Sequence, residues 1–464
     1  MTNQKTQELG TCRIGPLLWR MAAPAITAQI VNLFYNLVDR MYIGHIKGIG
    51  KLALTGVGVT LPIIMIISAF AALVSMGGAP RSSIFLGQGK KEEAEKILGG
   101  CTSMLVVISI TLTAVFLLFA DKLLLLFGAS ENTLPYALDY ILIYCMGTIF
   151  VQLTLGLNAF ITAQGFSTVS MRTVLIGAIS NIILDPIFIF GFHMGVRGAA
   201  LATIISQGIS CVWVLYFLTG KKTSLRIKKE HLRIRPSVVA PCLALGLAPF
   251  IMQSTESLLA VCFNSSLLKY GGDMAVGAMT ILTSVMQFSM LPLSGLSQGA
   301  QPIISYNYGA KNKERVKKAF FLLLASSVTY AVVLWLCAML MPQMFILLFN
   351  SDPALLAFTE KAMRVYMAVS CVFGVQIACQ QTFIALGDAK ASLFLAILRK
   401  ILLLIPLIYL LPAILPETLI SKTMAVFLAE PVSDFLAVAT TAALFSVRFR
   451  RALRDMDEPQ AQPL

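Results

Sequence analysis

The sequence predicts an all-α polytopic membrane protein with twelve transmembrane helices in two pseudo-symmetric lobes of six. Three observations predict this fold. The 464 residues are 57% hydrophobic and 12% charged, with a mean hydropathy of +0.82, whereas a soluble domain carries about 25% charged residues. Apolar runs of spanning length recur along the chain, and a segment near residue 77 returns near residue 299. A β-barrel would instead show alternating segments of about ten residues.

Each predicted helix is an apolar run long enough to cross a hydrocarbon core of about 30 Å. The third contains the uncharged stretch "CTSMLVVISITLTAVFLLFA". The first 15 residues are polar and lack the apolar core of a signal peptide, so we expect the first span to act as the targeting element. The predicted spans are 16–39, 55–85, 97–120, 134–158, 168–192, 198–219, 238–268, 275–305, 318–341, 357–386, 391–412 and 422–447.

The basic residues orient these helices. The net charge of +14 would also suit a nucleic-acid partner, but Lys and Arg gather in the cytoplasmic loops of membrane proteins. Twelve spans place both termini on one side, and most Lys and Arg, including those of 219–236, lie in loops on that side. Both termini are therefore predicted to be cytoplasmic. The nine Cys include no C-x-x-C pair and the three His are scattered, so we expect neither a metal site nor a cofactor.

An internal repeat divides the chain. "GGAPRSSIFLGQGKKEEAEK" (77–96) and "GAQPIISYNYGAKNKERVKK" (299–318) share seven of twenty positions at an offset of 222. The same offset relates Gly165 to Gly387 and Ser170 to Ser392, while Pro24 aligns with Pro249 at an offset of 225. The predicted domains are a cytoplasmic segment 1–15, an amino-terminal lobe 16–219, a basic cytoplasmic linker 220–237, a carboxy-terminal lobe 238–447 and a cytoplasmic tail 448–464. Parallel repeats with an even number of spans are typical of transporters that work by alternating access, and a duplicated channel or scaffold is the alternative.

Five acids interrupt the apolar spans, although an ionisable group at the bilayer centre costs about 2.5–3.5 kcal/mol on insertion scales. They are Asp39, Asp185, Glu256, Glu430 and Asp434. Such residues mark ion or substrate pathways, proton relays or helix contacts.

The amino-terminal lobe contains the best candidate for a cation site. Tyr35 and Asp39 lie four residues apart on one helical face, as do Asn181 and Asp185, and Thr203 lies in the sixth span. Two carboxylates out of water are costly to keep charged together, so this pair could load and release a proton or a sodium ion. The alternatives are that Asp39 extends to the outer interface beside Arg40, and that Asp185 is an ordinary helix-end acid before a proline.

The carboxy-terminal lobe offers a second set of polar residues. Glu256 lies in "APFIMQSTESLLA" with Gln253 one turn earlier, and could bind a cation or a positively charged substrate. Glu430 and Asp434 are four residues apart and could form either a packing contact or an ion site. The 21 Met favour adaptable apolar walls. The predicted substrate-binding residues are Asp39, Asp185, Glu256, Gln253, Asn32 and Met286.

Over nearly its full length the chain resembles the multidrug and toxic compound extrusion (MATE) family, most closely the bacterial MepA and DinF-like members. The resemblance is carried by "APAITAQIVNLFYNLVDRMYIG", "GGAPRSSIFLGQGKKEEAEK", "SNIILDPIFIFGF", "GVRGAALAT", "APFIMQSTESL" and "GAQPIISYNYGAKNKERVKKAF". It implies export of lipophilic, mostly cationic compounds from a prokaryotic cytoplasmic membrane, driven by inward flow of protons or sodium.

The resemblance also implies roles for single residues. The family's amino-lobe cation network falls on Asp39, Tyr35, Asn181, Asp185 and Thr203. Some members pair a seventh-span Glu, matched by Glu256, with a tenth-span Asp, but "CVFGVQIACQQTF" offers only glutamines. This departure favours proton coupling through the amino-terminal lobe, with sodium at Asp39, Asn181 and Asp185 as the alternative. Protonation of Asp39 is expected to bend or repack the first helix near Pro24 and expel the drug.

Other functions remain as alternatives. A lipid-linked oligosaccharide flippase of the same wider superfamily would carry lipid headgroups, often through a cavity rich in Arg. An intramembrane enzyme would need clustered Asp for a metal diphosphate or H-E-x-x-H, and neither occurs. We predict a transporter that functions as a monomer and needs no nucleic acid.

Overall fold

The computed structural model describes residues 4–349 and 352–457, and every regular element in these ranges is helical. The α-helices are α1 (Gln4–Thr11), α2 (Ile14–Gly44), α3 (Gly50–Gly87), α4 (Lys91–Leu126), α5 (Leu134–Met146), α6 (Thr148–Ala163), α7 (Ser167–Pro186), α8 (Val196–Thr219), α9 (Pro236–Gly309), α10 (Lys313–Leu340), α11 (Pro342–Ile346), α12 (Pro353–Tyr366), α13 (Phe373–Ala385), α14 (Ala389–Ile397), α15 (Ile405–Ile414) and α16 (Lys422–Asp455). Two π-helical segments, η1 (Ile187–Gly191) and η4 (Leu398–Leu404), follow α7 and α14, and η2 (Lys229–His231) and η3 (Ser370–Val372) are 3₁₀ turns.

The membrane-crossing helices agree with the predicted fold class. Among the described residues, nine helices are long and apolar enough to span a bilayer, or eleven if the bent pairs α5–α6 (58°) and α12–α13 (48°) each count as one span. Helix α9 has 74 residues, or about 110 Å at 1.5 Å per residue, far more than one bilayer requires. It is interrupted at Gly272, whose φ of 62° and ψ of −160° suit only glycine. Counting α9 as two spans gives the predicted twelve, and the all-helical membrane fold is confirmed.

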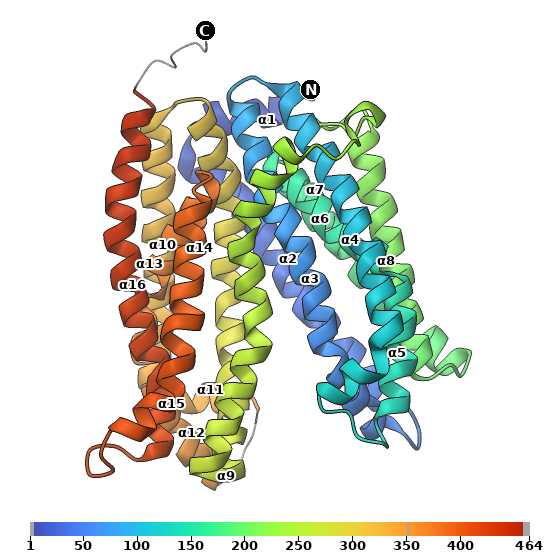
Figure 1. Ribbon diagram of the computed structural model, residues 1–464, viewed down its shortest axis with the longest axis vertical. Coiled ribbons are helices and arrows are strands. Elements are labelled where there is room, and N and C mark those ends of the chain that lie inside the picture. The colour runs from blue at the N-terminus through green and yellow to red at the C-terminus, as the bar shows by residue number, and fades with distance from the viewer. Residues whose placement is uncertain (1–3, 350–351, 458–464) are drawn as a thin grey trace.

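The helices form two bundles (Figure 1). The first bundle comprises α2–α8, and the second comprises α9–α16. Helix α1 and the end of α16 lie at the same end of the molecule, which we call the terminal end (Figure 1). The ribbons of the two bundles lie close together there and diverge toward the opposite end (Figure 1).

The bundles meet backbone to backbone at the terminal end. A Cβ atom added to Gly77 of α3 would lie 1.8 Å from the carbonyl oxygen of Cys242 in α9, and one added to Gly309 would lie 1.9 Å from that of Ile84. Carbon and oxygen atoms cannot approach so closely, so glycine is required at both positions. These contacts explain why Gly77 and Gly309 lie in the repeated segments that relate the two halves.

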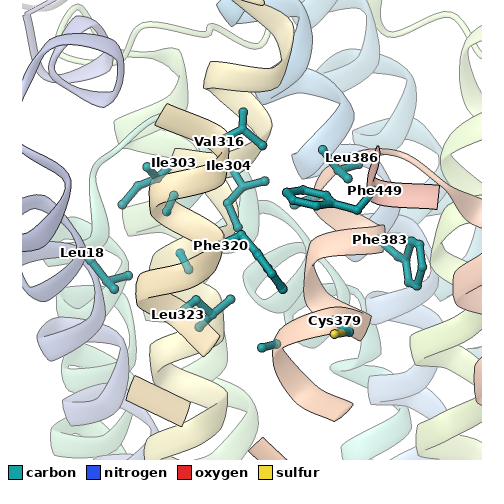
Figure 2. Packing of buried hydrophobic residues seen from close by; sticks show 14 of the residues in the cluster. Leu18, Ile303, Ile304, Val316, Phe320, Leu323, Cys379, Phe383, Leu386 and Phe449 are labelled. Atoms are coloured by element: carbon teal, nitrogen blue, oxygen red, sulfur yellow. The ribbon is translucent and has the colours of Figure 1, made fainter. Parts of the chain in front are cut away.

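Apolar packing continues across the same junction. Figure 2 shows the cluster in which Leu18 of α2 packs with Ile303 and Ile304 of α9 and Phe320 of α10. Phe320 stacks on Phe445 with a ring-centroid distance of 4.5 Å. Helix α2 therefore begins against the second bundle, although its later part, which carries Asp39, packs on α7 of the first.

Residues at the terminal end connect the two bundles. In α1, the Thr6 hydroxyl donates to the carbonyl oxygen of Gln164 in the first bundle. The Arg315 guanidinium of the second bundle donates to the carbonyl oxygens of Leu9 and Cys12.

The segment between the bundles packs on the first one. Lys228 forms a 2.6 Å ion pair with the buried carboxylate of Glu95. The hydrogen bond within this pair raises the pKa of the Lys228 ammonium above its ordinary value. The linker is therefore held against α4 by this ion pair and by hydrogen bonds of its backbone at Arg226 and Leu232.

Gly77→Val should push the bundles apart at the terminal end, because its side chain would overlap the backbone of α9. We expect a longer mean distance between spin labels at positions 90 and 318, measured by pulsed electron paramagnetic resonance in a background without native cysteines. Gly58→Val is the matched control, since a Cβ atom at Gly58 of the same helix meets nothing within 4 Å. Equal distances in the two variants would show that the glycine contact does not hold the bundles together.

Candidate functional site

Two buried carboxyl groups face each other inside the first bundle. Asp39 of α2 is 8% exposed and Asp185 of α7 is fully buried. Their carboxyl groups lie near each other. None of the ion pairs found in residues 4–349 and 352–457 joins Asp39 to Arg40, whose side chain is exposed. The structure therefore differs from the alternative in which Asp39 extends to the outer interface.

Polar side chains from three helices complete this site. The Asn181 amide nitrogen donates to Asp185 Oδ1 at 3.3 Å and to the Thr203 hydroxyl of α8 at 3.4 Å. Thr203 in turn donates to the carbonyl oxygen of Ala199 at 3.0 Å. Tyr35, one turn before Asp39 on α2, lies within electrostatic range of both acids. The five residues expected to form the cation network thus lie together.

Three oxygen atoms of this site lack a partner. Asp39 Oδ1, Asn181 Oδ1 and Asp185 Oδ2 are buried, and none has a hydrogen-bond partner among the described residues. A buried acceptor without a donor is costly, and a buried carboxylate needs a positive partner. A proton on one of the two carboxyl groups, or a small cation that prefers oxygen ligands, would supply part of what these atoms lack. The three buried acceptors therefore belong to side chains that are uncharged or negative, as a candidate cation site requires.

The α7 helix ends directly after Asp185. Pro186 follows Asp185 directly and cannot donate a backbone hydrogen bond, and the chain continues as the π-helical segment η1. Short π segments inside helices often occur at functional sites.

Tyr140 is a residue of this site that the sequence analysis missed. It lies in α5, is 4% exposed, and is close to Asp39, Tyr35 and Thr203. Its ring stacks on that of Tyr144 with centroids 6.1 Å apart. The regular spacing of tyrosines along α5 was the available signal, but aromatic residues in a span usually mark packing or the membrane interface.

A polar cavity of about 50 Å³ extends from the cation site between α6, α7 and α8. This volume can hold a few water molecules. Two further buried acceptors, Asn158 Oδ1 and Gln207 Oε1, line the cavity without a partner in the part of the chain that the structure describes. Its other lining residues include Asn32, Tyr35, Thr173, Gly177, Asn181, Thr203, Ser206 and Ser210. Asn32, predicted as a substrate ligand, therefore lies beside the cation site.

The second bundle contains a separate charged cluster. Arg399 of η4 is 6% exposed, and its Nε donates to Asp434 Oδ1 of α16 at 2.7 Å. A longer contact of 3.5 Å joins its Nη2 to Glu430 Oε1. The guanidinium also lies 4.5 Å from the ring centroid of Phe373. Glu430 and Asp434, for which the sequence left packing contact or ion site open, thus flank a buried arginine.

Glu256 has a lysine partner. Lys400 is 7% exposed and donates from Nζ to Glu256 Oε1 at 2.8 Å, whereas the Glu256 side chain is 56% exposed. Next to Glu256, Ser257 contacts Met65 Sδ of α3 across the junction between the bundles. Arg399 and Lys400 are consecutive in a π-helical turn, and both pair with acids far away in sequence, so spacing alone could not reveal these pairs.

The remaining predicted residues lie apart from the cation site. Gln253 is partly buried one turn before Glu256 on α9. Met286 packs against the apolar cluster of the second bundle. In α13, Gln376 accepts a hydrogen bond from Thr441 and Gln380 donates to Ser392, so these glutamines have structural partners. Within the described ranges no group of His, Cys, Asp and Glu has the arrangement of a metal site.

Comparison with known proteins identifies the family. The family profile described as MatE matches residues 24–187 and again residues 249–410. The chain belongs to the MatE family. The two matches begin at Pro24 and Pro249, the prolines that align in the internal repeat. MATE proteins are transporters, so this chain is an integral membrane transporter and not an intramembrane enzyme.

Individual relatives agree with this membership. The chain is 26% identical over 421 residues to "Multidrug export protein MepA" of Staphylococcus haemolyticus (strain JCSC1435), covering 91% of this chain and 92% of that protein. The solved structure of the MATE multidrug transporter DinF-BH, a complex with a bound ligand, is 34% identical, with a TM-score of 0.86 and coverage of 96% of this chain and 98% of that one. A MATE structure in a bent conformation shares the fold at a TM-score of 0.91 and 21% identity, covering 99% and 100%.

Arg399→Met should strongly destabilise this MATE protein, because it leaves Asp434 and Glu430 buried without their cation. Breaking a buried pair costs about 3–5 kcal/mol. We expect a large fall in the unfolding midpoint of the purified protein in detergent, and recovery when Asp434→Asn and Glu430→Gln are added. Arg197→Met removes the arginine of an exposed pair with Asp139 and should change the midpoint little. A similar loss in the Arg197 and Arg399 variants would contradict the structural role of the buried cluster.

Proposed function

We propose that the chain exports lipophilic, mostly cationic compounds across the prokaryotic cytoplasmic membrane in exchange for protons. The observation that carries this proposal is the set of three buried, unpartnered oxygen atoms on Asp39, Asn181 and Asp185. The first bundle supplies the negative charge of this site but no cation bonded to it among the described residues. A proton that enters and leaves would balance this charge and couple its own flow to transport.

The relatives support the substrate class. MepA is named a multidrug export protein, and DinF-BH is named a multidrug transporter and was solved with a ligand bound. Glu256, with its exposed carboxylate, and Gln253 would meet a cationic substrate from the second bundle. Asp39, Asp185 and Asn32 would meet it from the first, and Met286 would contribute to an adaptable apolar wall.

Coupling follows from linkage between proton and drug. A ligand shifts a conformational equilibrium only by its difference in affinity for the two states. Protonation removes the charge that attracts a cationic drug to Asp39 and Asp185, so each ligand weakens binding of the other. The packed glycine contacts at the terminal end and the diverging opposite ends supply the two regions whose closure would alternate.

The membrane orientation is part of the proposal. Most Lys and Arg residues of the loops lie at the terminal end, so both termini would face the cytoplasm. One chain contains both bundles and the cation site, so a monomer would suffice. Sodium is the alternative coupling ion, because Asp39, Asn181 and Asp185 offer the oxygen ligands that hard cations prefer. The flippase alternative predicts basic groups for phosphates, but Arg399 and Lys400 are already paired with acids.

In liposomes containing the purified protein, wild type should move ethidium uphill when only a proton gradient is imposed. Asp39→Asn should reduce this uphill transport at least about tenfold, because the amide is always neutral and cannot exchange a proton. Glu360→Gln is the matched control, since Glu360 pairs with Arg364 on the surface of α12.

Three other outcomes would change the proposed function in different ways. Uphill transport with a sodium gradient alone would reject the proton and retain the site. Full activity of Asp39→Asn would reject the site. Failure of folded wild type to accumulate ethidium with either ion, combined with movement of a fluorescent lipid-linked oligosaccharide, would replace the drug-export proposal with the flippase.

A further inference from the structure

The charged cluster of the second bundle joins three acids to two basic side chains. Asp434, Glu430 and Glu256 carry three formal negative charges, whereas Arg399 and Lys400 carry two positive ones. A cluster this far from bulk water is more stable when its charges balance.

A further positive charge from an organic cation is supplied most directly at the Glu256 side chain. Arg399, Glu430, Asp434 and Lys400 are each at most 7% exposed, so they are covered in this conformation. The Glu256 side chain is 56% exposed and lies on α9 beside the contact between Ser257 and Met65. Glu256 is therefore the accessible edge of a buried charged network.

Lys400 has a second acid within reach. Its ammonium bonds Glu256 at 2.8 Å and also lies within electrostatic range of Glu430. Glu430 is only weakly held by Arg399, at 3.5 Å, because the short bond of that guanidinium goes to Asp434. A lysine is a flexible stem with a compact charge and three donors, so its ammonium can turn from one neighbouring acid to another.

We propose that Glu256 is a binding site for a monovalent organic cation, and that Lys400 is its displaceable counter-ion. The incoming cation takes the exposed Glu256 carboxylate, and the Lys400 ammonium turns to Glu430. The network then contains three negative and three positive charges. The inference rests on the proposed export of cations, because it defines how the second bundle receives them.

This arrangement makes Lys400 a determinant of selectivity. A neutral compound cannot replace the ammonium at Glu256 and gains nothing from the exchange. A cation can bind the Glu256 carboxylate, but it competes there with the Lys400 ammonium, which is always present. This competition lowers the affinity of the protein for the cation. Weak binding of this kind favours release after transport.

Lys400→Met is the first test, since Met keeps much of the length and the apolar stem of Lys but removes the competing charge. We expect the Kd for tetraphenylphosphonium, measured by equilibrium dialysis on the full chain in detergent, to fall about tenfold, equivalent to about 1.4 kcal/mol. Triphenylphosphine oxide, a neutral compound of related shape, should bind equally to wild type and variant. Adding Glu256→Gln to Lys400→Met should abolish the gain.

Lys400→Arg keeps the positive charge in the buried position and should change the Kd in the opposite direction from Lys400→Met. The planar guanidinium binds carboxylates in a bidentate manner, so it should hold Glu256 more firmly and raise the Kd for tetraphenylphosphonium. Lys51→Met is the matched control for loss of one positive charge, because Lys51 is exposed at the start of α3. This variant should bind both probes as wild type does.

Equal Kd values for tetraphenylphosphonium in wild type, Lys400→Met and Lys400→Arg would overturn the inference, as would weaker binding in Lys400→Met. If wild type binds tetraphenylphosphonium and the Lys400 variants bind it equally well, the proposed export of cations would still stand. Absence of binding in wild type and in every variant would contradict both proposals.

Discussion

A carboxylate that leaves water must receive a positive partner, and the interior of this protein is organised around that requirement. Fully burying an isolated charge costs far more than a folded protein can spare. Asp39 and Asp185 nevertheless lie in the first bundle without any cationic side chain bonded to them among the described residues. In the proposed function the partner is a proton from outside the chain, and its arrival and departure would change the charge of the bundle. The packing of α2 on α7 brings these two acids together.

The second bundle meets the same requirement differently. At the repeat offset of 222 residues that relates Ser170 to Ser392, Gly177 and Ala178 of α7 correspond to Arg399 and Lys400 of η4. The small residues leave space, and Gly177 lines the cavity beside the cation site. The basic residues instead place two permanent cations against Asp434 and Glu256. One half of the duplicated chain is thus suited to a mobile cation, and the other carries its cations as side chains.

Much of this architecture could be predicted from the sequence, because apolar length and internal repetition are local properties. Asp39, Asn181 and Asp185 could be predicted for a related reason, since polar residues in apolar spans are rare. The pairs Arg399–Asp434 and Lys400–Glu256 could not, because they join residues 35 and 144 positions apart and depend on how helices pack. The bend between α5 and α6 occurs at the single residue Gly147, and α9 is interrupted at Gly272. Neither glycine changes the hydropathy pattern enough for the bend angle to be predicted from the sequence.

The most direct test of the cation site is to count protons released when a drug binds. Saturating tetraphenylphosphonium would be added to the purified protein in weakly buffered solution containing a pH indicator. Because drug and proton oppose each other at Asp39 and Asp185, the account predicts release of about one proton per wild-type chain and a much smaller release from Asp39→Asn. Drug binding to wild type without any proton release between about pH 5 and pH 8 would contradict the central claim that these acids carry an exchangeable proton.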